Sequence, residues 1–534
     1  MNKLPLIERG DHSNQFKSRA HYDVRITTQI LLVFVAIVFL VLFSRLFELT
    51  IAKGDYYRRL SDENRIREII IEPKRGTIID TKGQALATVE PKQQKTKDRI
   101  ELRRVYREPE SIAPLVGYRQ IADENDLKND LCFDKSILGD KVGKKGIEKL
   151  YECDLRGKKG KKLIELDARG KQYKVLTVIP PEDGKTIQLG LDLRLQKKAQ
   201  ELLKDKKGAV IGLIPKTGEV ITLFSSPSYN IQDFEDAKNQ VIQSYLTSDA
   251  HPLFNRATEG VYPPGSIYKL FVATGALEEK KIDTSTIFED TGTIQAGPIT
   301  FGNWYFLEYG RKEGEVDIIK ALQRSNDIFF YRTGARLGVQ HMKKWSEIFG
   351  LGHKINMSLE QAEGTIPSPY WKRDILNEDW FLGDTYNMAI GQGYLSTTPM
   401  QIAMASAVFA NNGSACTPQF LKDAKSDCKK LPISQKTIDL IRQGMKAACT
   451  TGGTGWPLFD FKVKGEKLQV GCKTGTAESH SKSKIPHAWF TVFAPFDKPE
   501  VAFTILVENA GQGSDIAAPI AKELLQIYFE TTTR

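Results

Sequence analysis

Residues 26–43, ITTQILLVFVAIVFLVLF, are the feature that most constrains the fold of this chain. The stretch has 18 residues and no charged side chain. At ~1.5 Å per residue, a helix over it is ~27 Å long and matches the hydrocarbon core of a bilayer. Leu46 and Phe47 extend it, and the following residues FSRLFE offer no small-residue cleavage site. We therefore expect an uncleaved transmembrane anchor over 26–47, preceded by a short tail over 1–25.

The charges around the anchor do not orient it. The positive-inside rule places the more basic flank in the cytoplasm. Four basic residues lie within twenty positions on each side, so the count is a tie. They are Arg9, Lys17, Arg19 and Arg25 before the anchor, and Arg45, Lys53, Arg58 and Arg59 after it.

Length and charge restrict the remaining possibilities. A chain of 534 residues, 41% hydrophobic and 27% charged, has the composition of a globular protein with two or three domains. The net charge of +10 suits an anionic neighbour. The most lysine-rich stretch, 141–162, contains few aromatic side chains that would stack on bases, so we expect a solvated basic face there and no nucleic-acid partner.

The six cysteines show no C-x-x-C pair and no metal-ligand spacing, and the seven histidines are scattered. We therefore predict no metal and no cofactor. Cys416 and Cys428 are close enough in sequence to bridge a loop, but two unpaired cysteines are equally compatible with the pattern.

Residues 48–190 alternate short apolar runs with charged turns, which indicates an extended, partly β-structured pedestal. From 191 the pattern changes to a helix, two strands at 208–214 and 219–224, a long helical block, three further strands and a closing helix. We expect one antiparallel sheet flanked by helices. The first K-T-G triplet, at 216–218, is predicted to be a hairpin turn, whereas the second, at 473–475, is predicted to lie on an inner strand.

The residues VYPPGSIYKLF (261–271) place Ser266 after a Pro-Pro-Gly turn, at the start of an apolar helix. Lys269 follows three positions later, on the same helix face. Free backbone N–H groups at a helix start stabilise a developing oxyanion. A neutral lysine would accept the serine proton, but lowering its pKa from ~10.4 to about 7 costs on the order of 4–5 kcal/mol. Desolvation and a second cation, for which Lys473 is the candidate, must supply that energy.

The S-x-x-K pattern alone is weak, because it recurs at Ser426, Ser479 and Ser481 in polar, lysine-rich stretches. Only Ser266 has the turn followed by a helix. Between it and the second K-T-G lies SNDIFFY, in which Ser325 and Asp327 precede an apolar helical run. Taken alone, Ser325-Asn326-Asp327 would be a helix cap.

In this order, S-x-x-K, S-x-D and K-T-G resemble the motifs of the penicillin-binding proteins. Further stretches that match the family are YYRRLSDENRIREIIIEPKRGTIIDTKGQALA (56–87), GIEKLYECDLRGKKG (146–160), PKTGEVITLFSSPSYN (215–230) and NMAIGQGYLSTTPMQIAMASAVFANNG (387–413). The resemblance implies an α/β (α+β) serine-transpeptidase fold over 191–534, carried on a pedestal over 48–190. The pedestal resembles that of the class B members and shows no glycosyltransferase domain. The S-x-D motif is more similar to the elongation type, penicillin-binding protein 2, than to the division type.

For the site, the resemblance implies that Ser266 attacks the D-Ala–D-Ala carbonyl of a peptidoglycan stem peptide and forms an acyl-enzyme. Lys269 would be its general base, and Ser325 would pass the proton to the leaving amine. Lys473 would tune this group electrostatically. Asp327 is the unusual member, because a carboxylate near Lys269 favours the charged lysine.

Substrate binding would fall to the second K-T-G. Thr474 and Thr476 would hold the substrate carboxylate, and Gly475 would allow close approach of backbone. The backbone N–H groups of Ser266 and Thr476 would form the oxyanion hole.

The resemblance also implies partners and a location. The catalytic domain would lie outside the cytoplasmic membrane, with residues 1–25 in the cytoplasm and β-lactams as covalent inhibitors. A polytopic glycosyltransferase and other elongation-complex proteins would contact the pedestal. Three alternatives remain: a β-lactam hydrolase, a penicillin-sensing receptor, for which the tail is too short, and a catalytically idle assembly scaffold.

Overall fold

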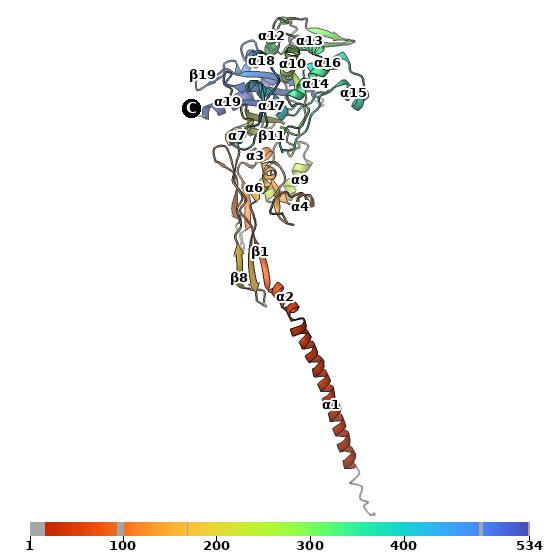
Figure 1. Ribbon diagram of the computed structural model, residues 1–534. Helices are drawn as coiled ribbons and strands as arrows, with labels where there is room; N and C mark the ends of the chain where they lie inside the picture. The colour runs from red at the N-terminus through yellow and green to blue at the C-terminus, as the bar shows by residue number, and fades with distance from the viewer. Residues whose placement is uncertain (1–15, 93–100, 168, 480–483, 532–534) are drawn as a thin grey trace, which may run out of the picture. The chain divides into compact units, whose positions relative to one another are not determined.

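The computed structural model describes residues 16–92, 101–167, 169–479 and 484–531, in two compact units (Figure 1). The smaller unit comprises residues up to Glu72 together with Lys159–Pro181. The larger unit comprises Pro73–Lys158 and Glu182–Arg534. The predicted tail over 1–25 lies largely outside the described residues.

The smaller unit begins with a long apolar helix. Residues 25–52 have a mean hydropathy of 2.9 in their most apolar window, none of which is buried by protein. This is the one described helix that is long and apolar enough to cross a membrane, and it covers the predicted anchor. A three-stranded antiparallel sheet of order β1-β7-β8 follows. The elements are α1 (Phe16–Phe47), a π-helical turn (Glu48–Ala52), α2 (Gly54–Arg65), β1 (Ile66–Ile71), β7 (Gly160–Leu166) and β8 (Gln172–Ile179).

The first part of the larger unit is a small mixed region. Its four-stranded sheet has the order β4-β3-β2-β9, and its apolar side chains share one core with strands β10 and β11 of the main sheet. The elements are β2 (Ile78–Ile79), β3 (Ala85–Lys92), β4 (Glu101–Tyr106), α3 (Pro109–Val116), β5 (Arg119–Ile121), α4 (Glu124–Lys128), β6 (Lys141–Gly143), α5 (Gly146–Leu150), α6 (Glu152–Arg156) and β9 (Ile187–Gln188).

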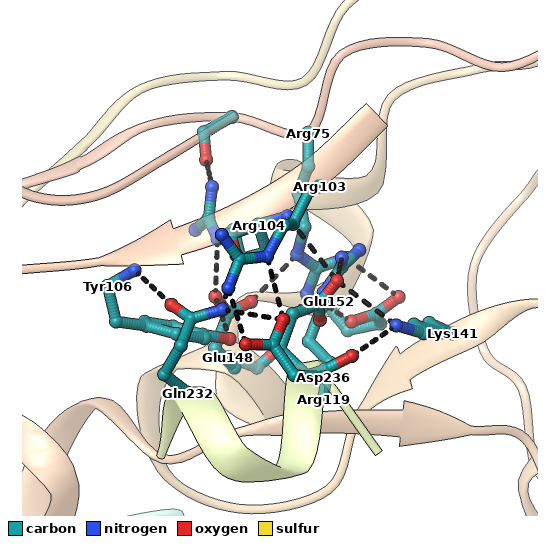
Figure 2. A network of polar contacts seen from close by, with 12 residues as sticks. Arg75, Arg103, Arg104, Tyr106, Arg119, Lys141, Glu148, Glu152, Gln232 and Asp236 are labelled. Atoms are coloured by element: carbon teal, nitrogen blue, oxygen red, sulfur yellow. Dashed lines mark hydrogen bonds and ion pairs between the residues drawn. The ribbon is translucent and has the colours of Figure 1, made fainter. Parts of the chain in front are cut away.

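A network of buried ion pairs also lies in this region (Figure 2). Glu148 is fully buried and accepts from Arg75 Nε at 2.7 Å and from Arg104 Nε at 2.8 Å. Arg75 also pairs with Glu152. Arg119 pairs with Glu235 of α8 (Gln232–Glu235) at 2.9 Å. These contacts tie residues far apart in sequence, from Arg75 to Glu235, into one packed unit.

The main sheet confirms the predicted fold class. Five strands pair antiparallel in the order β11-β10-β22-β21-β20. Side chains alternate between its faces: Phe490 and Val492 pack in one core with α7 and α19, whereas Trp489 and Phe493 pack in another with the helical block. The strands are β10 (Gly208–Ile214), β11 (Glu219–Ser226), β20 (Gly471–Ala477), β21 (His487–Ala494) and β22 (Val501–Val507).

The helices follow the expected order. A capping box starts α17, since the Thr398 side chain accepts from the Gln401 N–H and the Gln401 side chain accepts from the Thr398 N–H. The helices used below are α7 (Leu193–Leu202), α10 (Lys269–Glu278), α11 (Trp304–Tyr309), α12 (Ile318–Arg324), α13 (Asp327–Leu337), α17 (Pro399–Ala410), α18 (Gln435–Ala448) and α19 (Ala518–Thr531).

The two K-T-G triplets lie in different structures. The first is the turn between β10 and β11, closed by the Gly218 N–H donating to the Ile214 carbonyl at 2.9 Å, as predicted. The second lies on β20, and the prediction of an inner strand is wrong, because β20 is the last strand in the sheet order. Its side chains are largely buried because the Ser266 turn and α18 pack on it, not because strands flank it on both sides.

All six cysteines are paired. Cys416 bonds Cys428, which resolves the alternatives that the sequence left open. Cys132 bonds Cys153, and Cys449 bonds Cys472. The last pair links the end of α18 to β20, directly beside Lys473.

Candidate active site

Ser266 lies in a single 3-10 turn, Gly265–Ile267, immediately before α10. The preceding Gly265 has φ of +55°, and its N–H donates to the Gly391 carbonyl at 2.9 Å. A Cβ at Gly265 would lie 2.7 Å from the Thr476 carbonyl oxygen. Glycine is therefore required for both the conformation and the space, and the turn is held against β20.

Lys269 and Lys473 are completely buried, and both contact Ser325. Lys269 Nζ donates to Asp327 Oδ1 at 2.6 Å and to the Ser325 carbonyl at 2.8 Å. Lys473 Nζ donates to Ser325 Oγ at 2.8 Å. Lys269 Nζ also lies 3.4 Å from the same hydroxyl. The Ser325 hydroxyl thus bridges the two ammonium groups.

The environment lowers the pKa of both lysines. Burial lowers the pKa of Lys269, and Asp327 acts in the opposite direction. Burial also lowers the pKa of Lys473 well below its usual value; the charge of Lys269 adds to this, and Asp327 opposes it. Both lysine side chains are fully buried and share one carboxylate, so their charged forms are destabilised and each lysine releases its proton more easily.

Asp327 is held from two sides. Its Oδ2 accepts from the Trp304 backbone N–H at 2.9 Å, and its own N–H donates to Asn303 Oδ1 at 3.0 Å. Asn326 caps α13 by accepting from the Phe329 N–H at 2.8 Å. The triplet Ser325-Asn326-Asp327 is therefore a helix cap and also carries side chains of the site.

The outer edge of β20 faces the cleft. Thr474 Oγ1 lies 2.7 Å from Thr454 Oγ1. Gln392 Nε2 donates to the Thr476 carbonyl at 3.1 Å, and Gln392 Oε1 accepts from the Glu478 N–H at 3.1 Å. A Cβ on Gly475 would lie 3.0 Å from the Pro264 carbonyl oxygen, so backbone does come close at this position.

The cleft itself has a volume of about 1110 Å³. Five of the expected site residues line it, and Ser266 is half-buried there. Aromatic side chains supply much of the remaining wall. The expected residues on the wall are Ser266, Ser325, Asp327, Thr474 and Thr476; the aromatic ones include Trp304, Tyr309, Tyr331 and Trp456. Lys269 and Lys473 do not line the cleft, but Lys269 contacts the wall residues Asp327 and Ser325, and Lys473 contacts Ser325.

Sequence reasoning missed four residues of the site: Asn303, Trp304, Gln392 and Thr454. Three of them bond to motif residues more than 20 positions away, and none belongs to a motif with a chemical signature of its own. The apolar-aromatic run NWYFLEY at 303–309 was the available signal. Of the other S-x-x-K serines, Ser426 is exposed in a loop, Ser479 bonds Asn509, and Ser481 lies outside the described residues.

Two family models match the chain. The model of the penicillin-binding protein transpeptidase domain matches residues 208–526, and that of the penicillin-binding protein dimerisation domain matches residues 99–189. The chain therefore belongs to the penicillin-binding proteins with a transpeptidase domain, the class that the fold and the three motifs define.

Within that class, several of the similar proteins are elongation-type transpeptidases. A peptidoglycan D,D-transpeptidase MrdA from Haemophilus influenzae is 30% identical over 91% of this chain and 89% of its own length. Its counterpart in Escherichia coli K12 is 31% identical over 77% and 69%. Penicillin-binding protein 2 of Helicobacter pylori, solved in complex with MreC, superposes with a TM-score of 0.76 at 28% identity, covering 88% of this chain and 99% of that one. The expected resemblance to penicillin-binding protein 2, the elongation type, is confirmed.

Proposed function

We propose that this chain cross-links peptidoglycan stem peptides as an elongation-type D,D-transpeptidase, through an acyl-enzyme on Ser266. The observation that carries this proposal is the bridge made by Ser325. Its hydroxyl contacts both buried ammonium groups, 2.8 Å from Lys473 and 3.4 Å from Lys269, and it lines the cleft that also contains Ser266. A serine nucleophile and a proton carrier therefore share one cleft, with two lysines of lowered pKa behind it.

In the first half-reaction, Ser266 Oγ attacks the carbonyl carbon between the two D-alanines. Lys269, in its neutral form, takes the serine proton. The backbone N–H groups of Ser266 and Thr476 stabilise the oxyanion, while Thr474 and Thr476 hold the terminal carboxylate. The C–N bond then breaks, Ser325 delivers a proton to the amine, and D-alanine leaves.

In the second half-reaction, an amine of a neighbouring stem peptide attacks the ester carbonyl. The amine loses a proton, Ser266 regains one, and a new amide bond joins the two strands. Lys473 donates to the Ser325 hydroxyl and orients it for proton transfer. Asp327 positions Lys269, although its negative charge favours the protonated form of that lysine. Trp304 and Asn303 hold Asp327 in place.

The location and partners extend the same proposal. Residues 26–47 anchor the chain in the cytoplasmic membrane, with residues 1–25 in the cytoplasm and the pedestal (48–190) and transpeptidase domain (191–534) outside. One apolar helix and the match to the dimerisation-domain model support this arrangement. We infer that the pedestal contacts elongation-complex proteins, including a polytopic glycosyltransferase. Two similar structures, a complex with MreC and a peptidoglycan synthase complex, support such partners.

Covalent labelling tests the proposal. The full chain in detergent is treated with fluorescent penicillin, and the label is followed over time by gel and by intact mass, beside Ser266→Ala. We expect one stable adduct on the parent and none on the variant. Rapid loss of the label would indicate the β-lactam hydrolase instead, and no label on a folded parent would indicate the idle scaffold.

A cross-linking assay separates transfer from acylation. Parent chain and a lipid-linked precursor polymerised by an added glycosyltransferase are digested, and the products are separated by chromatography. We expect cross-linked dimers from the parent and none after Ser266→Ala or after penicillin treatment. Trimmed monomers without dimers would contradict a transpeptidase and indicate a carboxypeptidase.

A further inference from the structure

Asp290 is a buried carboxylate without an assigned role, at the end of strand β12 (Phe288–Asp290). It is 2% exposed and does not line the cleft. Four N–H groups donate to it, and over the residues that the structure describes no lysine or arginine pairs with it. The donors are Gly292 N at 2.8 Å to Oδ1, and Asn303 Nδ2 at 2.7 Å, Asn326 Nδ2 at 2.9 Å and Glu313 N at 3.1 Å to Oδ2.

Two of these donors are side-chain amides that also contact the site. An amide has a donating face and an accepting face, whereas an ionised carboxylate only accepts. Asp290 therefore requires Asn303 and Asn326 to present their NH2 groups to it. Both residues are fully buried, so neither amide has water as an alternative partner.

The orientation of each amide fixes what its oxygen does. Asn303 Oδ1 accepts from the Asp327 N–H at 3.0 Å, and Asn326 Oδ1 accepts from the Phe329 N–H at 2.8 Å. A reversed amide would place N–H against N–H at either position and leave a buried donor unsatisfied, which costs about 1–3 kcal/mol. Asp290 thus determines both contacts without touching the residues of the cleft.

The two contacts converge on the partner of Lys269. Asn303 holds the backbone of Asp327, and the next residue, Trp304, holds the Asp327 carboxylate through its N–H at 2.9 Å. Asn326 starts the helix that carries Asp327. The carboxylate so placed accepts from Lys269 Nζ at 2.6 Å.

We propose that Asp290 is a positioning residue for acylation: by orienting the amides of Asn303 and Asn326, it sets the placement of Asp327 against Lys269. The inference rests on the proposed function, since it assigns Asp290 to the proton transfer at Ser266. A residue of this kind changes the rate and its pH dependence, whereas a residue that only supports the fold changes the amount of folded protein.

The test uses Asp290→Asn, which keeps the shape but replaces one acceptor by a donor. Acylation by fluorescent penicillin is timed per reactive molecule, counted from the final extent of labelling, and the melting temperature is measured in parallel. We expect a rate at least tenfold lower than that of the parent and a shifted acid limb of the pH profile. Asp317→Asn is the matched control, because Asp317 accepts from Lys320 N at the start of α12 and is exposed; its rate should stay within twofold of the parent.

A double-mutant cycle with Asn303→Ala tests whether Asp290 acts through Asn303. If Asp290 acts through Asn303, Asp290→Asn lowers the rate at least threefold less in the Asn303→Ala background than in the parent. A parent-like rate and pH profile for Asp290→Asn would overturn the proposal, whether or not the melting temperature falls, and so would fully additive effects. Failure of the parent itself to take the label would overturn the proposed function instead, so the two failures are distinguishable.

Discussion

Two groups of buried charges lie in the larger compact unit, and they hold different cations. The group around Glu148 contains arginines, and the group around Asp327 contains lysines. Glu148, Arg104, Lys269 and Lys473 are all at 0% exposure, whereas Asp327 also lines the cleft. An arginine does not release its proton in a protein, whereas a buried lysine does so when its pKa falls.

The surroundings hold the first group in its charged form and favour the neutral form of the lysines in the second group. Burial acts to raise the pKa of Glu148, but Arg104 and Arg75 outweigh it and lower that pKa to about 2. Burial likewise opposes the charge on Arg75, yet its carboxylate partners raise its pKa. The pKa of Lys269 and of Lys473 is lowered instead. The first group is fixed in its charged form and stabilises the fold; the second is poised to move a proton.

Replacement of Lys269 is expected to have the largest effect, a loss of acylation. We expect both Lys269→Met and Lys269→Arg to lower the acylation rate by about 10³-fold, within the usual contribution of a general base. Arginine keeps the positive charge beside Asp327 but cannot accept the serine proton. The measurement is the second-order rate of labelling by fluorescent penicillin. Rapid labelling of Lys269→Arg would show that the charge alone suffices and that Lys269 is not the base.

Glu148→Gln tests the other group. Removing this carboxylate leaves Arg75 and Arg104 without their shared partner, and we expect the free energy of unfolding to fall by about 3 kcal/mol or more. Labelling per folded molecule should be unchanged. Denaturant unfolding of the full chain in detergent gives the first quantity. Glu182→Gln is the control, because its pair with Lys158 is exposed and should contribute less than about 1 kcal/mol.

The same carboxylate gives a pH dependence with a definite sign. Its folded pKa of about 2 lies below the ordinary value of 4.5, so its stabilisation is present above pH 4.5 and is lost as the pH falls towards 2. Acid unfolding of the parent in this window should be steeper than that of Glu148→Gln. Equal pH dependence of the two chains would contradict the assignment.

Lys473→Met is expected to lower the acylation rate without lowering the stability of the fold. We expect acylation to fall by about 10²-fold, the low end for a group that acts on proton transfer, because the Ser325 hydroxyl loses the lysine that donates to it. Stability at neutral pH should not fall, since a buried cation whose charged form is disfavoured is removed and the Lys269–Asp327 pair remains. A chain that is both inactive and strongly destabilised would place Lys473 with the structural group.

Periodicity and turn chemistry were sufficient to predict the sheet, its flanking helices and the first K-T-G hairpin. These features depend on neighbours in sequence. The motif serines and lysines were found for the same reason, since each motif carries its chemistry within four residues. Lys473 was named as the second cation beside Lys269 from the pKa that a lysine base requires, whereas the role of Asp327 beside them followed only from the family resemblance.

What the sequence did not provide depends on distant contacts. Trp304 and Asn303 reach Asp327 across more than 20 residues, and Cys449 reaches Cys472 across 23. The edge position of β20 was not predicted, because its residues are typical of an inner strand with neighbours on both sides. Packing of the Ser266 turn, where a Cβ at Gly265 would lie 2.7 Å from the Thr476 carbonyl oxygen, explains that burial without a second flanking strand.

The pH dependence of acylation tests the central claim most directly. The second-order rate of penicillin labelling of the parent is measured across the pH range in which it stays folded, beside Lys473→Met. Because the two lysines interact, the acid limb belongs to the pair. A limb well below the ordinary lysine value of 10.5 in both chains is the predicted result, because burial lowers the pKa of Lys269. A rate that does not change with pH, or a limb at the ordinary lysine value in both chains, would contradict a buried lysine base.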